Sequence, residues 1–477
     1  MDVADAHRLT ELLTEYRAGA LALASLTLAV LASLHIVQRK RDPRAAAAWL
    51  GLVWLVPFLG CALYLVLGVN RIRRRARQLT GGELEPVGGW RAAAEAVPTD
   101  PNLRSLSALV GQVTGLPLTA GNDVAVLDAP QAHDWMRKAI DGARESVYLG
   151  SYIFGNDAAG IPVADALINA HRRGVRVRVL VDGVGALYSL PTIVSYLKRH
   201  GVVVHRFLHS LAPWRMPYMN LRNHRKIMVV DRQVGFTGGM NIRAGYLAEP
   251  ASIRDLHFRL HGPVVSHLLR SFTADWYFAC RELVDGAYRG PAMCGTVMAR
   301  GISGGPDADF DKRRLALLGA LNRAEHRIRI MTPYFVPDQT LQSALNLARL
   351  RGVEVDLFLP QKNNLRIVQW ASLFIVPWLL RQGVNVYLVP PPFDHSKLMV
   401  VDDSWVMLGS GNWDARSLTL NFEFDVECYC SRLGTQLSTW LDQRQQQAQA
   451  LDQRWADAQG PGVRLRNAMA HLLEPYL

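Results

Sequence analysis

An internal duplication fills most of this chain and limits its possible folds more than any other feature. Residues 140–154 (IDGARESVYLGSYIF) align with 321–335 (LNRAEHRIRIMTPYF), and each segment predicts a helix end followed by a buried strand. The alignment continues, with 173–177 (RGVRV) beside 351–355 (RGVEV) and 200–204 (HGVVV) beside 382–386 (QGVNV). Both halves therefore alternate helix, glycine turn and strand. This alternation predicts two α/β lobes, each with helices beside a largely parallel or mixed sheet, related by a pseudo-twofold axis.

The 477 residues exceed one ordinary domain, as a duplicated unit requires. We predict a membrane anchor with two transmembrane helices at 1–80 and a linker at 81–118. The first lobe is predicted at 119–290 and the second at 291–477.

Two apolar runs near the N-terminus predict the membrane anchor. Residues 18–37 run about twenty positions with His35 as the clearly polar interruption, which is the length a helix needs to cross a bilayer. Residues 45–69 repeat the pattern. Trp49 and Trp54 lie between basic flanks, which favours a membrane hairpin over a buried core helix. A cleaved signal peptide fits poorly, because 39–41 (RKR) follow where small residues should precede cleavage.

Charge sets the expected orientation and partners. Four basic residues lie in the turn between the runs and seven lie on the other side, which favours a cytoplasmic catalytic domain on a multi-pass protein of the inner (plasma) membrane. The net charge of +12 favours anionic partners such as nucleic acid, phosphate esters or acidic lipid headgroups, and does not choose among them. The five cysteines are scattered without zinc-binding spacing, so no metal site is predicted.

A motif that can carry chemistry occurs once in each half. The pattern H-x-K-x-x-x-x-D is formed by His224, Lys226 and Asp231, and again by His395, Lys397 and Asp402. One copy would arise by chance on the order of once per hundred chains, whereas two copies in duplicated contexts are not chance. Each histidine is followed seventeen residues later by an asparagine, Asn241 or Asn412, within Gly238-Gly239-Met240-Asn241 or Gly409-Ser410-Gly411-Asn412.

The spacing assigns different roles within the motif. On a strand, a histidine and the lysine two residues later project from the same face. Asp231 and Asp402 lie at odd spacing from their histidines and should point away, so we expect them to form structural salt bridges or turn hydrogen bonds. Two imidazoles and two ammonium groups can supply a nucleophile, a proton donor and positive charge for a phosphodiester. Asn241, Asn412 and Ser410 are expected to bind the phosphate oxygens.

The duplicated motif with G-G/S-x-N resembles the phospholipase D superfamily. The resemblance implies an internally duplicated phospholipase D-like fold, a covalent phosphohistidine and no metal or other cofactor. A nucleophilic imidazole needs a carboxylate on its second nitrogen. Asp255 and Glu423, at comparable positions after the two motifs, are the candidates, with ordinary strand-end acids as the alternative. The other histidines near the first motif, His205, His209, His257 and His261, are expected to be structural or surface groups.

Within the superfamily, the chain resembles bacterial cardiolipin synthases over nearly its whole length. Shared features include the hairpin with Arg41-Asp42-Pro43 and the context Asn223-His224-Arg225-Lys226. The segments 211–223 and 367–383 are apolar and aromatic, and each predicts either a lipid contact or core packing.

The resemblance implies that two phosphatidylglycerol molecules are joined with release of glycerol. On that scheme, His224 attacks the first lipid's phosphorus, while His395 protonates the departing glycerol and later deprotonates the acceptor. The expected partners are phosphatidylglycerol, anionic membrane lipids and the membrane, with no nucleic acid. The oligomeric state is left open. The alternatives are a membrane-bound phospholipase D that uses water as the acceptor, and a lipid-binding scaffold, against which the two complete motifs argue.

Overall fold

The computed structural model describes residues 3–40, 43–68, 95–208, 221–248, 252–284, 292–306 and 309–474. The described residues form two units, one within residues 3–68 and the other within residues 95–474. Residues 81–94 of the predicted linker and residues 211–220 of the segment 211–223 lie outside the described residues.

The N-terminal unit contains one long helix and a second, interrupted helical run. Helix α1 spans Val3–Arg39, and its part Thr14–Arg39 is the one helix among the described residues that is long and apolar enough to cross a membrane. The second run is divided into α2 (Pro43–Leu55), α3 (Pro57–Leu63) and the π-helix η1 (Tyr64–Gly68). Pro57 explains the break at Val56, because proline lacks an N–H and clashes with the preceding turn. The run predicted as the second transmembrane helix is therefore interrupted at Val56.

The second unit is built on a mixed sheet of fifteen strands, in the order β19-β13-β12-β10-β15-β16-β18-β9-β1-β8-β6-β5-β2-β3-β4. The first lobe contributes β1 (Thr119–Asp128), β2 (Ser146–Ser151), β3 (Arg176–Asp182), β4 (Val203–Phe207), β5 (Ile227–Val230), β6 (Val234–Gly238) and β8 (Leu256–His261). The second contributes β9 (Val297–Gly304), β10 (Arg327–Met331), β12 (Glu354–Pro360), β13 (Asn385–Val389), β15 (Leu398–Val401), β16 (Trp405–Gly409), β18 (Glu423–Tyr429) and β19 (Gln449–Leu451).

The strand order confirms the predicted duplication. The sequence β9-β18-β16-β15-β10-β12-β13 on one side repeats as β1-β8-β6-β5-β2-β3-β4 on the other, with the antiparallel pair β1 and β9 at the centre. In each lobe three strands are parallel, β2, β3 and β4 in the first and β10, β12 and β13 in the second, and the strands that follow the histidine are antiparallel. Strand β19 adds an antiparallel edge to the second lobe. The two lobes thus join edge to edge into one continuous sheet.

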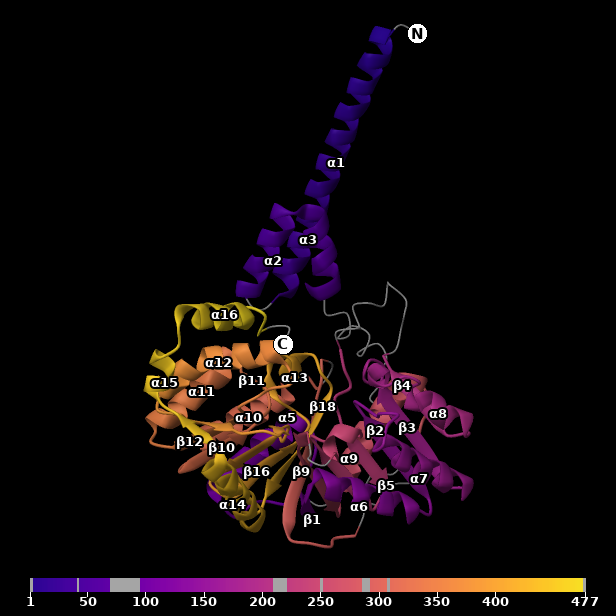
Figure 1. Cartoon of the computed structure of the whole chain (residues 1–477), viewed down its shortest axis with the longest axis vertical. Coiled ribbons are helices and arrows are strands. Elements are labelled where there is room, and N and C mark those ends of the chain that lie inside the picture. Colours follow the sequence, from indigo (N-terminus) through magenta and orange to yellow (C-terminus); the bar gives the residue numbers. More distant parts are fainter. Residues whose placement is uncertain are drawn as a thin grey trace. The chain divides into compact units, whose positions relative to one another are not determined.

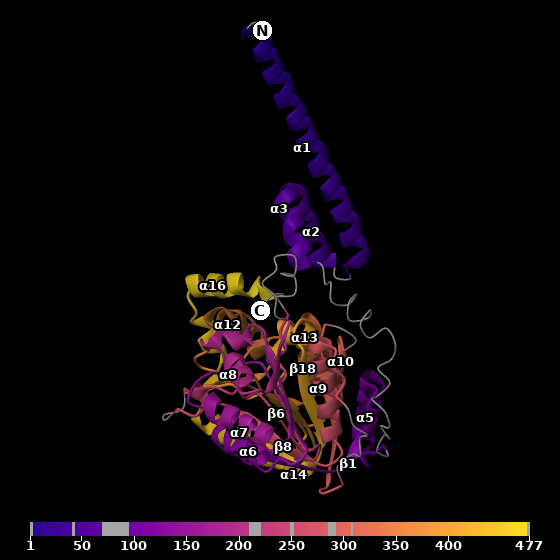
Figure 2. The ribbon, with the colours of Figure 1, turned by 90° about the vertical axis from the view of Figure 1, so that its right-hand side faces the viewer.

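Helices cover both faces of this sheet (Figures 1 and 2). They are α6 (Ala129–Asp141), α7 (Gly160–Arg172), α8 (Ile193–Arg199) and α9 (Val265–Cys280) in the first lobe, and α10 (Lys312–Arg323), α11 (Gln339–Leu350), α12 (Arg366–Arg381), α14 (Ser431–Gln447), α15 (Gln453–Asp457) and α16 (Pro461–His471) in the second. One apolar core is shared by both lobes, because Trp276 of α9 and Leu437 of α14 belong to the same buried cluster. This shared core packs the two lobes against each other.

Helix α5 (Pro101–Thr114) lies inside the region predicted as linker, 81–118. The Asp100 carboxylate caps its start by accepting a hydrogen bond from the Asn102 N–H, and Gly115 ends it at a φ of 65°. Leu106 and Val110 are buried in the core of the second lobe. Residues 101–114 are therefore part of the folded body and correct the linker boundary.

Candidate active site

Each motif histidine is held by the backbone of the opposite lobe. His224 precedes β5, and its N–H donates to the Phe422 carbonyl at 2.9 Å. His395 precedes β15, and its N–H donates to the Arg254 carbonyl at 2.8 Å. The strand β14 (Phe393–Asp394) pairs in parallel with β7 (Ile253–Arg254) beside this second bond. The two buried histidines are thus positioned only when the lobes are joined.

The carboxylates that contact the histidines are exchanged between the lobes. Glu423 of the second lobe places Oε2 3.0 Å from Nδ1 of His224 in the first. Asp255 of the first lobe places Oδ2 2.8 Å from Nδ1 of His395 in the second. In both pairs Nδ1 is occupied, which leaves Nε2 as the ring nitrogen for chemistry. The structure therefore places the predicted histidine-orienting acids beside the histidines, each across the lobe boundary.

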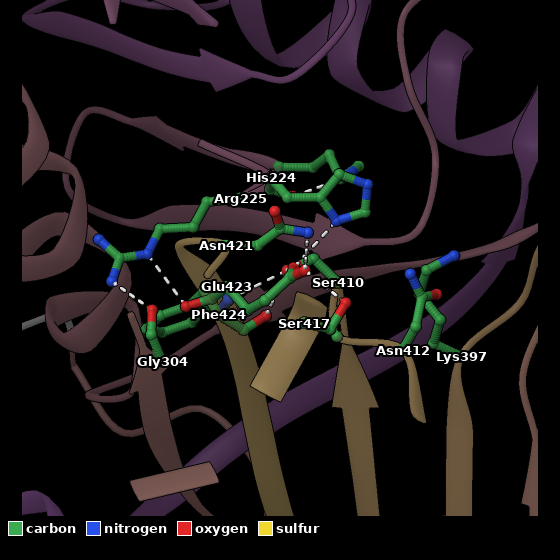
Figure 3. A network of polar contacts seen from close by, with 12 residues as sticks. His224, Arg225, Gly304, Lys397, Ser410, Asn412, Ser417, Asn421, Glu423 and Phe424 are labelled. Atoms are coloured by element: carbon green, nitrogen blue, oxygen red, sulfur yellow. Dashed lines mark hydrogen bonds and ion pairs between the residues drawn. The ribbon is translucent and has the colours of Figure 1, made fainter. Parts of the chain in front are cut away.

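Glu423 lies in a dense set of hydrogen-bond donors (Figure 3). Its Oε2 accepts from Ser410 Oγ at 2.6 Å, and its Oε1 accepts from Ser417 Oγ at 2.9 Å and from Asn421 Nδ2 at 3.3 Å. Burial alone raises the pKa of Glu423, but the charge and hydrogen bond of His224, together with Lys226 and Ser410, lower it to about 2. Glu423 is therefore a buried anion.

Asp255 has a different environment. Among the described residues no side-chain hydroxyl or amide donates to it, and burial raises its pKa well above the usual range. Gly239 gives this carboxylate room, because a Cβ at that position would collide with its oxygens. The two halves thus share one architecture, but one histidine faces a charged carboxylate and the other faces a carboxyl group that tends to keep its proton.

The two lysines concentrate positive charge at the histidines. Lys226 Nζ donates to the His224 carbonyl at 2.6 Å, while Lys397 Nζ donates to the His395 carbonyl at 2.5 Å and lies 3.1 Å from Nε2 of His395. Burial lowers the pKa of Lys226 to about 7 and that of Lys397 to about 8. Burial also lowers the pKa of His224 to about 4 and that of His395 well below its usual range. An anion bound between these groups would favour the protonated lysines.

The motif aspartates lie at the far ends of the strands and do not contact the histidines. Asp231 accepts three backbone N–H groups, those of Arg144, Glu145 and Ser146, at 2.7–2.9 Å. Asp402 repeats the arrangement with the backbone of residues 325–327 at 2.7–2.8 Å. Both aspartates therefore make hydrogen bonds with a backbone turn, which is one of the two expected structural roles.

The predicted phosphate-binding residues are all buried, but they have different neighbours. The Ser410 hydroxyl donates to Glu423 and accepts from the Phe424 N–H at 3.0 Å, so it supports the carboxylate and is not directed at a ligand. Asn241 accepts from the Ile153 N–H at 3.1 Å and donates to the Tyr246 hydroxyl at 3.4 Å. The backbone carbonyl of Asn412 accepts from the Arg313 guanidinium at 2.7 Å.

Several residues at the site were missed by the sequence reasoning. The Tyr152 ring lies 5.0 Å from the His224 ring, and the Tyr246 hydroxyl lies 3.3 Å from Nδ1 of His395. Arg225, between the motif histidine and lysine, pairs with Asp275 at 2.6 Å and donates to the Glu423 carbonyl at 3.0 Å. Tyr152 lies directly after the repeated strand of the first lobe, and this position in the sequence could have indicated that it lies near the site.

His257 is buried with its pKa lowered by burial to about 3, as expected of a structural histidine. No group of three or more His, Cys, Asp or Glu side chains in the described part of the chain could hold a metal ion. The charge available to an anion at the histidines comes from Lys226 and Lys397.

Comparison with known proteins finds sequence similarity over most of the chain. The family described as "Cardiolipin synthase, PLD-like domain" matches residues 136–276 and 317–445, and "Phospholipase_D-nuclease N-terminal" matches residues 27–68. A protein named Cardiolipin synthase A from Pseudomonas putida (strain W619) is 32% identical over 463 residues, covering 94% of this chain and 96% of the relative. Cardiolipin synthase A from Pseudomonas aeruginosa (strain LESB58) is 34% identical over 416 residues, covering 84% of each.

A solved structure shares the fold. The crystal structure of phosphatidylserine synthase from Haemophilus influenzae Rd KW20 superimposes with a TM-score of 0.62 at 14% identity. The match covers 79% of this chain and the whole of that one. The duplicated architecture is therefore shared with a protein of low sequence identity.

Proposed function

The chain belongs to the cardiolipin synthase family of phospholipase D-like proteins, and from that premise we propose that it transfers a phosphatidyl group between two phosphatidylglycerol molecules and releases glycerol. The enzyme class is phosphatidyltransferase, and the family acts on phospholipids. The donor follows from the family, and the observation that carries the assignment of roles to the two histidines is the asymmetry between the two histidine–carboxylate pairs.

His224 is proposed as the nucleophile. Its low pKa keeps the imidazole neutral, and the ionised Glu423 accepts a hydrogen bond from Nδ1–H, so the lone pair of Nε2 is free to attack phosphorus. Once the Nε2–P bond forms, the imidazole becomes cationic. The buried Glu423 anion, supported by its own donors, stabilises that cation.

His395 is proposed as the general acid and base. The raised pKa of Asp255 and the lowered pKa of His395 mean that the pair holds one proton between them, across a 2.8 Å contact. In the first step Nε2–P forms, the bond from phosphorus to the glycerol oxygen breaks, and this pair protonates that oxygen. In the second step the acceptor hydroxyl returns a proton to the pair, its oxygen bonds to phosphorus, and the bond to His224 breaks.

The lysines are proposed to bind the non-bridging oxygens. Lys226 and Lys397 are buried beside the two histidines, where ammonium groups stabilise the charge that develops on a phosphorane. Asn241 and Asn412 are proposed to add neutral hydrogen bonds. One phosphodiester replaces another, so this scheme needs no cofactor.

The membrane arrangement is also proposed. Helix residues Thr14–Arg39 support membrane association, and the apolar second run supports a multi-pass anchor. The arginines that flank the runs favour a catalytic unit on the cytoplasmic side of the inner membrane. Attachment concentrates the acceptor lipid, and a bound, oriented acceptor can reach an effective molarity of roughly 10⁵ M or more against water.

Product analysis tests the proposal. Purified full-length protein with phosphatidylglycerol and no cytidine nucleotide should form cardiolipin and glycerol in equal amounts, and added glycerol should drive the reaction backwards. His224→Asn, prepared identically, is the control for a contaminating activity. Phosphatidic acid as the main product would favour the phospholipase D alternative. A requirement for CDP-diacylglycerol would refute the proposed donor.

A further inference from the structure

Helix α16 presents its large apolar side chains outward. Its buried face is made by Asn467 and Ala470, while Leu465 and Met469 are 63% and 62% exposed, and Leu472, directly after the helix, is 78% exposed. The helix lies along α12, where the Arg466 guanidinium stacks 4.8 Å from the Trp370 ring. A surface helix of a water-soluble body normally turns such side chains toward the core.

Exposed apolar residues also flank the site on both lobes. In the second lobe, Leu365 and Ile367 at the start of α12 are exposed. The neighbouring Asn364 accepts a hydrogen bond from Tyr334 at 2.8 Å, and the Tyr334 ring lies 6.2 Å from His395. These residues therefore connect the start of α12 with the second histidine.

The first lobe has a matching edge. Leu187 and Tyr188 of η2 (Gly185–Tyr188) are exposed, and Leu190 is 78% exposed. The Tyr188 ring lies 6.4 Å from the ring of Tyr152, which in turn contacts His224. Apolar residues thus extend outward from both histidines.

The exposed apolar residues of α16, of the start of α12 and of the η2 region are together called the docking face. They are Leu187, Tyr188, Leu190, Leu365, Ile367, Leu465, Met469 and Leu472. In Figures 1 and 2, α16 and α12 lie at the same end of the catalytic unit as α13 (Ala415–Thr419), the short helix that carries Ser417.

The docking face is bordered by positive charge. Lys362 and Arg366 lie within a few residues of Leu365, and Arg464 and Arg466 alternate with the apolar residues of α16. Apolar side chains interleaved with basic ones are the composition of helices that lie in the interface of an anionic bilayer. Long basic side chains can extend their charges to the headgroups while apolar neighbours enter the acyl boundary.

We propose that the docking face rests on the surface of an anionic bilayer, so that a lipid headgroup reaches the buried histidines while its acyl chains stay in the membrane. The inference rests on the proposed function for the identity of the ligand as a membrane phospholipid. It gives the catalytic unit a membrane contact of its own, separate from the N-terminal helices. A two-chain lipid need not be extracted into water, which would expose its acyl chains.

Paired substrates test this contact in the full-length protein. The double variant Leu465→Glu/Leu472→Glu is assayed on phosphatidylglycerol vesicles and on dihexanoyl phosphatidylglycerol below its critical micelle concentration. Two charges placed in the interface should reduce the vesicle rate about tenfold or more, because interfacial binding depends on buried apolar area. The rate on the monomeric lipid should stay unchanged. Leu465→Trp/Leu472→Trp should keep the vesicle rate, because tryptophan suits the interface.

Leu350→Glu is the matched control. Leu350 is 75% exposed, like Leu472, but it ends α11 just before the start of β12, at the opposite edge of the sheet from Tyr334. This variant should match the parent protein on both substrates. The proposal would be overturned if Leu465→Glu/Leu472→Glu had the same rate on vesicles as Leu350→Glu. An equal loss of rate on both substrates would also overturn the proposal. If the molecular mass of the variant in sedimentation then differed from that of the parent protein, the docking face would instead be an interface with a second copy of the chain. A failure of the proposed function would give a different result, because the parent protein itself would then make cardiolipin from neither lipid.

Discussion

Replacing Asp231 by asparagine should destabilise the protein while leaving its chemistry nearly intact. The carboxylate accepts three backbone N–H groups at the start of β2, two through Oδ1 and one through Oδ2. Asparagine keeps one acceptor oxygen and directs an NH₂ group at the remaining N–H donor. β5 separates this turn from His224, so the geometry of the site should change little.

The size of the effect follows from the lost contacts. A hydrogen bond to a charged group contributes about 1.5–3 kcal/mol, and Asp231→Asn removes one such bond and weakens two. We therefore expect a loss of about 2–4 kcal/mol in the free energy of unfolding. For a unit the size of one lobe, each kcal/mol shifts the unfolding midpoint by roughly 2–4 °C.

Thermal unfolding in detergent, with kcat measured well below the midpoint, provides the assay. The midpoint should fall by roughly 4–16 °C and kcat should stay within about threefold of the parent value. Asp402→Asn should repeat this result, because its three acceptor bonds are equivalent. His224→Asn should give the opposite pattern, with stability kept and activity lost. A normal midpoint with kcat reduced about 10³-fold would refute the structural role of Asp231.

The remaining predictions concern the chemistry. His224→Ala or His395→Ala should each lower turnover about 10³-fold or more, and mass spectrometry of a trapped intermediate should find phosphatidyl on His224; a label on His395 would reverse the roles. Exhaustive chelation with EDTA should leave activity intact when lipid packing is controlled, whereas loss and rescue by one divalent ion would contradict the charge-stabilising role of Lys226 and Lys397. The profile of kcat/KM should fall as pH rises through about 7 to 8, because these lysines lose their protons, and fall on the acid side only near pH 4, where His224 becomes protonated. Activity that climbs between pH 7 and 9 would rule out this assignment.

Local patterns were enough to predict much of the protein. The repeated strand and turn segments predicted two α/β lobes, and the period of a strand placed each histidine and its lysine together. The same period predicted that Asp231 would point away from the histidine, and Asp231, which follows β5 at a φ of 47°, makes hydrogen bonds with a backbone turn. These features could be predicted because they depend on neighbours within one short segment.

Averaged hydropathy was less reliable for predicting where helices begin and end. The second apolar run predicts a single span when its composition is considered alone, yet Pro57 divides it. The caps Asp100 and Gly115 were visible in the sequence, and a closer reading of them would have placed α5 in the folded body.

The tertiary structure alone decided how the site is assembled. Sequence position indicated that Asp255 and Glu423 would each orient a histidine, but it could not show that each does so across the lobe boundary. Nor could it show that Ser410 supports Glu423, or that Asp255 receives no comparable hydroxyl or amide donor from the residues that the structure describes. Strand periodicity fixes which face a side chain occupies, whereas these contacts and the resulting pKa values depend on how the two lobes pack, and that packing joins residues nearly two hundred positions apart.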